Sequence, residues 1–151
     1  MTNDEFISRI LLSVRSVFDQ SRELLAVALV AHGDGELAII SLDFRSEAHK
    51  ERTLSALRSY CAEQKATHVA VVSEAWATSH APGSDLSELQ RPSLDPRRYE
   101  VAIVRIEGSE GVQVFSAPIT GQGDNRQLGG FEEVGQSQGR MTDGLLSFQV
   151  V

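Results

Sequence analysis

The stretch His68-Val69-Ala70-Val71-Val72-Ser73-Glu74-Ala75-Trp76 decides the expected architecture, because it begins as an apolar run and ends in polar and aromatic residues. Its first part, residues 68–73, is short and rich in β-branched side chains, which predicts a buried strand. The helical pattern that precedes it is long enough to serve as a crossover to a parallel neighbour. We therefore expect this strand to lie at the centre of a sheet.

Two helices are predicted on the N-terminal side of this strand. Residues 2–19 carry Thr2 or Asn3 as a cap, and apolar side chains recur at helical spacing after it. Residues 46–65 begin with Ser46 as a plausible cap and again place apolar side chains on one helical face. The apolar positions are Phe6, Ile10, Val14, Val17 and Phe18 in the first helix, and Ala48, Leu54, Leu57 and Cys61 in the second. Both stripes are expected to face the core.

Two hairpins are expected around these helices. Residues 24–31 and 37–42 are apolar runs separated by a glycine-containing turn, which is typical of paired strands. Residues 99–107 and 112–118 repeat this pattern across a second turn that also contains glycine.

The remaining segments carry weaker signals. The stretch about 77–98 contains three prolines and many small polar residues, so we expect a long loop that is functional or flexible. The stretch about 120–144 is rich in glycine and has no clear period, and residues 145–151 form an apolar segment that is suited to an edge strand. No linker interrupts residues 1–151, which indicates one domain. The whole pattern predicts an α+β fold: a mixed, largely antiparallel sheet of about five to six strands with two helices packed on it.

Composition narrows the class of protein. The chain has 151 residues, of which 41% are hydrophobic and 23% charged, as in ordinary folded domains. The net charge of −7 repels phosphate backbones, so a nucleic acid is a disfavoured partner. The single cysteine, Cys61, cannot form an internal disulfide, and neither a signal peptide nor a membrane span is evident. These features favour the cytoplasm and argue against a membrane partner.

The usual signatures of catalysis and cofactor binding are not found. Metal-ligand spacings are missing, and His80 with Glu74 is the nearest approach to a metal pair, so no metal or other cofactor is expected. Residues 121–126 begin like a dinucleotide-binding loop but have arginine in place of the third glycine. A Gly-x-Ser-x-Gly elbow is missing, and Cys61 falls on a buried helix face, where a thiol is inert.

The segment Ser73-Glu74-Ala75-Trp76 and the later segment Pro96-Arg97-Arg98-Tyr99-Glu100 together resemble a family of uncharacterised bacterial and phage proteins. In that family a strand ending in Ser-Glu-Ala-Trp is followed by a proline-containing loop and then by Pro-x-Arg-x-Glu. The resemblance covers about 30 residues and implies a fold and a location for the site. It implies no reaction, because the family has no assigned activity.

The two segments also predict a contact between strands. Side chains alternate along a strand, so Glu74 and Trp76 share one face, and Arg98 and Glu100 share one face of the next strand. Our hypothesis is that Glu74 and Arg98 form a charge-assisted pair next to the Trp76 ring. Such a pair acts either as a structural lock or as part of a binding site.

Two functions remain open. The first is a non-catalytic interaction module that associates with itself or with another protein through its apolar helix face or an exposed edge strand. The second is a small hydrolase or small-molecule-binding enzyme with Glu74 as general base and His80 or Arg98 as the positioning group. The candidate catalytic residues are therefore Glu74 and His80, and the candidate binding residues are Trp76, Arg98 and Glu100.

Overall fold

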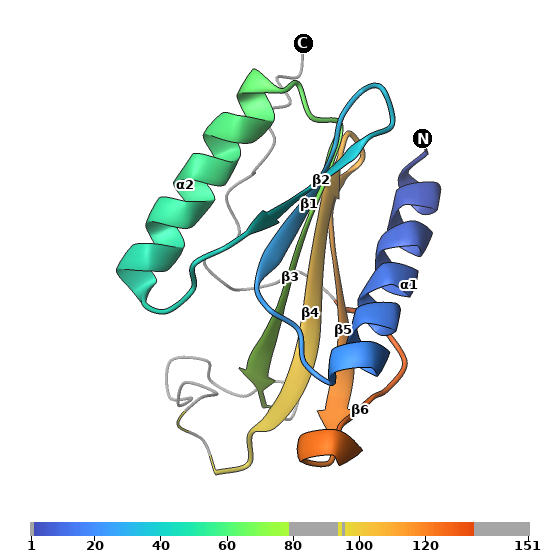
Figure 1. Ribbon diagram of the computed structural model, residues 1–151, viewed down its shortest axis with the longest axis vertical. Coiled ribbons are helices and arrows are strands. Elements are labelled where there is room, and N and C mark those ends of the chain that lie inside the picture. The colour runs from blue at the N-terminus through green and yellow to red at the C-terminus, as the bar shows by residue number, and fades with distance from the viewer. Residues whose placement is uncertain (1, 79–93, 95, 135–151) are drawn as a thin grey trace, which may run out of the picture.

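The computed structural model describes residues 2–78, 94 and 96–134, which form one antiparallel sheet with a helix on each side (Figure 1). The spatial order of the strands is β2-β1-β3-β4-β5-β6, and β7 pairs with another part of β5. The elements are α1 (Asn3–Ser21), β1 (Val27–Ala31), β2 (Leu37–Ser41), α2 (Glu47–Glu63), β3 (His68–Ala77), β4 (Tyr99–Gly108), β5 (Gly111–Thr120), the 3-10 turn η3 (Gly123–Asn125), β6 (Gln127–Leu128) and β7 (Glu132–Val134). The predicted α+β class is confirmed.

Helix α1 begins and ends for identifiable local reasons. The Thr2 hydroxyl accepts a hydrogen bond from the Glu5 N–H, and the Glu5 carboxylate accepts one from the Thr2 N–H, which closes a capping box. The helix ends where Arg22 adopts a left-handed conformation, with φ of 61°. The predicted helix is confirmed, and its buried face consists of Phe6, Ile10, Val14 and Phe18.

The central strand β3 has two antiparallel neighbours, β1 and β4. The prediction that β3 is central is therefore confirmed, whereas the parallel neighbour that the preceding helix allowed is wrong. Helix α2 connects β2 to β3, which run in the same direction because both are antiparallel to β1, and β1 lies between them. Both predicted hairpins, β1 with β2 and β4 with β5, are present.

The two helices cover different parts of the two sheet faces. Helix α1 packs over β3, β4 and β6, and its buried side chains contact those of the central strands. Helix α2 packs on the other face, where Leu54, Leu57 and Cys61 contact β1 and β3. Because α1 is shifted towards β4, the outer strands β1 and β2 are less covered on the α1 side.

The segment after β5 has more regular structure than its composition predicts. Gly121 lies in a tight turn with φ of 80°, and a Cβ atom there would meet the Asn125 carbonyl oxygen. This turn leads into η3 and then into β6 and β7, which pair with β5. The irregular character predicted for about 120–144 is therefore only partly correct over 120–134, and 135–144 lie outside the described residues. The predicted strand at 145–151 lies outside the described residues.

Candidate functional site

Glu74 projects from β3 on the face that carries α1, and both of its carboxylate oxygens are bonded. Oε2 accepts hydrogen bonds from the Leu24 backbone N–H at 2.7 Å and from Arg126 Nη1 at 3.2 Å, and Oε1 accepts one from Arg126 Nη2 at 2.8 Å. The side chain is 24% exposed. Glu74 therefore ties the segment between α1 and β1 to the segment that follows β5.

Arg126 is the centre of this cluster. Besides Glu74, its guanidinium donates to Glu100 Oε2 at 2.8 Å and to the Arg22 carbonyl at 2.7 Å, and it lies over the Phe18 ring. The hydrogen bond with Glu74 raises the pKa of Arg126, against the lowering effect of burial. One largely buried cation thus joins α1, β3, β4 and the chain after β5. We call Glu74, Glu100 and Arg126 the arginine lock.

The predicted pairing of Glu74 with Arg98 needs correction, because Arg126 is the arginine that binds Glu74. The part of the prediction that concerns the strands is confirmed: Trp76 lies directly opposite Glu100 in the β3–β4 register. Arg98 lies over the Trp76 ring, with its guanidinium carbon 4.5 Å from the ring centre. His80, the other candidate catalytic residue, lies outside the described residues.

The geometry of Glu74 bears on its proposed role as a general base. A general base needs an unoccupied lone pair within reach of a substrate proton. In Glu74 two charge-assisted bonds and one backbone bond use three of the roughly four acceptor positions of the carboxylate. This arrangement suits a structural connection, and it lends no support to proton transfer.

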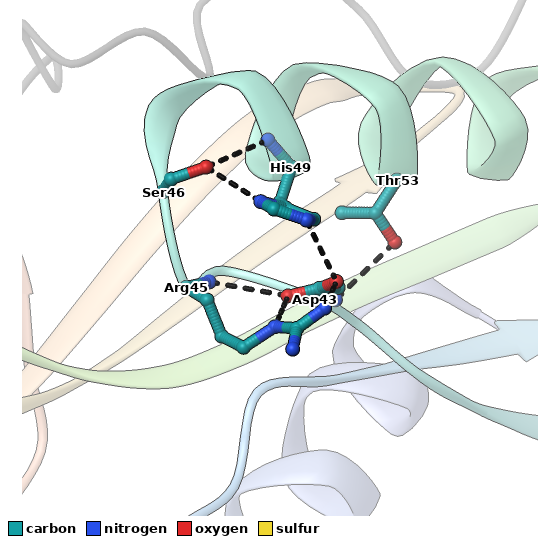
Figure 2. A network of polar contacts seen from close by, with 5 residues as sticks. All are labelled: Asp43, Arg45, Ser46, His49 and Thr53. Atoms are coloured by element: carbon teal, nitrogen blue, oxygen red, sulfur yellow. Dashed lines mark hydrogen bonds and ion pairs between the residues drawn. The ribbon is translucent and has the colours of Figure 1, made fainter.

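A second polar cluster surrounds the start of α2 (Figure 2). Ser46 Oγ is 2.6 Å from His49 Nδ1 and accepts the His49 backbone N–H at 3.2 Å, and His49 Nε2 is 4.0 Å from Asp43 Oδ2. In space, the contacts run from the Ser46 hydroxyl through His49 to Asp43, which resembles the arrangement of a Ser-His-Asp catalytic triad. However, the Asp43 carboxylate is bound at 2.9 Å and 2.8 Å by Arg45, which lowers the pKa of Asp43 to about 2.

The 4.0 Å separation between His49 and Asp43 exceeds hydrogen-bond range, so the histidine is not oriented as a relay requires. Ser46 is the N-cap of α2, and its hydroxyl satisfies a backbone N–H that the helix cannot. The cluster is accounted for as a helix cap. The predicted cap at Ser46 is confirmed.

An apolar groove of about 280 Å³ lies between α1 and the outer strands, on the sheet face that α1 only partly covers. Three of its side chains are unusually exposed for aliphatic residues: Val17 at 51%, Leu25 at 71% and Ile39 at 72%. They come from α1, from the segment before β1, and from β2. The groove is lined by Ser13, Val14, Val17, Ser21, Glu23, Leu24, Leu25, Val27, Leu29, Ile39 and Val72.

The sequence pattern predicted that Val17 faces the core, placed Ile39 in a strand without assigning its side chain, and gave no role to the groove. The available signal was that 37–42 is apolar at nearly every position, whereas an edge strand with one solvated face should alternate. Edge position itself depends on the pairing partners of β2, which periodicity does not reveal.

A wider polar cleft of about 520 Å³ lies beside the β1–β2 turn. Its walls include His32, Asp34, Glu36 and Tyr60, and the Tyr60 hydroxyl is 3.3 Å from His32 Nε2. Asp34 is already engaged by the Glu36 backbone N–H as part of the turn.

Within residues 2–78, 94 and 96–134, no group of three or more metal-binding side chains gathers, and no helix is long and apolar enough to cross a membrane. Comparisons of this chain with protein-family models, curated proteins and solved structures gave no match. The resemblance to uncharacterised bacterial and phage proteins therefore stays a prediction.

Proposed function

We propose that this protein is a non-catalytic interaction module that associates with a second copy of itself through the apolar groove. The observation that carries the proposal is the exposure of Val17, Leu25 and Ile39 around one groove next to the edge strand β2. Single exposed aliphatic residues are ordinary on a protein surface, whereas a group that surrounds a hollow is typical of an interface.

A second copy is the occupant that the position of the groove favours. The groove reaches the edge of the sheet, so a two-fold axis at β2 would bring the same side chains of both copies together. In such an interface each residue contributes twice, which suits a small surface. The net charge of −7 opposes this association, so salt should strengthen it by screening the repulsion.

The alternative of a small hydrolase or small-molecule-binding enzyme stays a prediction that the geometry of Glu74 does not support. The arginine lock occupies the carboxylate that this mechanism needs. The groove that adjoins α1 is lined mostly by aliphatic side chains, and of its lining within the described part of the chain only Glu23 is charged. Such a lining suits an apolar side chain better than a polar substrate.

Sedimentation velocity over a wide range of protein concentrations tests the proposal. The wild-type chain should shift from monomer to dimer as concentration rises, and Ile39→Lys should oppose the shift. Burying an isoleucine that is 72% exposed contributes about 1–2 kcal/mol, and a symmetric dimer contains two of them. A loss of about 2–4 kcal/mol weakens the dimer by at least about 30-fold.

Leu12→Lys is the matched control. Leu12 is 71% exposed, as Ile39 is, but it faces away from the groove on α1. It should leave the dimer unchanged. A wild-type chain that sediments as a monomer at every accessible concentration, or equal weakening by both substitutions, would overturn the proposal.

A further inference from the structure

The backbone of β2 has an outward-facing hydrogen-bonding edge, and the ladder with β1 shows which residues form it. His32 donates to the Glu36 carbonyl, and Leu42 donates to the Ala26 carbonyl, at the two ends of the hairpin. Bonded and non-bonded pairs alternate along an antiparallel ladder. The bonded pairs inside the hairpin are therefore Ala28 with Ile40 and Val30 with Ala38.

The residues between these pairs direct their N–H and C=O groups away from β1. They are Leu37, Ile39 and Ser41, and no described strand pairs with β2 on that side. Their side chains share the sheet face that carries the groove, with Ile39 in its lining and Leu37 packed against the adjoining core. The apolar surface and the unpaired backbone are thus two aspects of the same residues.

Natural edge strands usually carry a defence against pairing with another chain, such as a lysine, a proline, a bulge or a cover. Strand β2 reads Leu-Ala-Ile-Ile-Ser and contains no charged residue and no proline. The nearest charges, Glu36 and Asp43, lie beyond its ends. Among residues 2–78, 94 and 96–134, no strand pairs with this edge, which leaves it available for strand addition.

We propose that two copies pair through β2, antiparallel, with the two-fold axis at Ile39. In this register Ile39 lies opposite Ile39 of the second copy, and Leu37 lies opposite Ser41. Each of these is an outward-facing residue, so each pair exchanges both of its backbone hydrogen bonds. The two sheets become one continuous sheet, and the two grooves lie side by side on one of its faces. This inference rests on the proposed self-association and specifies how it occurs.

Amide hydrogen exchange followed by NMR tests the pairing, because neighbouring amides of β2 point in opposite directions. The amides of Ile39 and Ser41 should exchange slowly in a concentrated sample and rapidly in a dilute one. When nine-tenths of the chains are paired and exchange occurs only from the monomer, the slowing is about tenfold. The amides of Ala38 and Ile40 bond β1 and serve as internal controls, with equal protection at both concentrations.

A proline at residue 41 gives an independent test. Ser41→Pro removes one outward-facing N–H but none that β1 uses, and an edge strand tolerates proline in that orientation. It should weaken the dimer by about tenfold or more, whereas Ser41→Ala, which keeps the N–H, should not. Far-UV circular dichroism establishes that the proline variant is folded, and the exchange experiment needs no variant.

The outcomes distinguish pairing through β2 from the proposed self-association through the groove, on which it rests. A wild-type dimer whose Ile39 and Ser41 amides exchange equally fast at both concentrations would refute strand pairing and leave self-association through the groove intact. The same conclusion would follow if Ile39→Lys disrupted the dimer while folded Ser41→Pro did not. A chain that stays monomeric refutes both.

Discussion

Replacing Arg126 with alanine should destabilise the protein more than any other single substitution in the arginine lock. The Arg126 side chain is 14% exposed, and its guanidinium makes two bonds to Glu74, one to Glu100 and one to the Arg22 carbonyl. Removing one partner of a buried ion pair costs about 3–5 kcal/mol, because a charge is left without compensation. Glu74 and Glu100 are 24% and 36% exposed, so water partly replaces the arginine. We expect a loss of about 2–4 kcal/mol.

Thermal and urea unfolding measure this loss, and a drop in Tm of about 5–15 °C is expected for a domain of this size. Arg98→Ala is the matched comparison, because it removes a cation–π contact with the half-exposed Trp76 that contributes about 0.5–1 kcal/mol. A double-mutant cycle of Arg126→Ala with Glu74→Gln should give a coupling of about 1–3 kcal/mol. The reasoning is refuted if Arg126→Ala costs less than about 1 kcal/mol, or no more than Arg98→Ala.

Two further substitutions test other parts of the structure. Ser46→Ala removes the cap of α2 and should cost about 1 kcal/mol in urea unfolding, whereas Ser46→Asp should retain the stability; equal effects of the two would contradict the capping role. Burial lowers the pKa of His68, which stacks on Phe6 beneath α1, so the folded protein disfavours the charged form. The free energy of unfolding is therefore highest, as far as His68 is concerned, above about pH 6.5. It declines as the pH falls towards the lowered pKa of His68, because the unfolded chain binds the proton more readily than the folded protein does. Tm measured from pH 5.5 to 7.5 should fall on the acid side in the wild type and less so in His68→Gln, and identical profiles would exclude this effect.

The sequence predicted secondary structure well because its signals are local. Thr2 and Ser46 cap the helices that follow them, and the turns that contain Gly35 and Gly111 close the two hairpins. Strand adjacency was harder to predict. The strands on either side of α2, β2 and β3, run in the same direction, as a crossover helix allows, but β1 lies between them, and the local sequence pattern does not show which strand takes that place.

The arginine lock was only half predictable for the same reason. Alternation along β3 and β4 placed Glu74 and Glu100 on one face, as the register shows. Their partner is 52 residues beyond Glu74 in a glycine-rich stretch without periodicity. Gly121 lets the chain turn back on itself after β5, and only this return places Arg126 against the two carboxylates. Charge type indicates that an arginine is needed, and alternation along the strand favours Arg98 because it shares a predicted face with Glu100.

The lock and the groove are connected through one backbone bond. Glu74 accepts the N–H of Leu24, which lies between α1 and β1, and the next residue is Leu25, one of the exposed side chains of the groove. A short segment between two elements would ordinarily have many conformations, and an exposed leucine on it would lose entropy on binding. Because Glu74 is itself held by Arg126, the position of Leu24 is fixed before any partner arrives. We therefore expect the Glu74 carboxylate to preorganise the surface through which we propose that the protein associates.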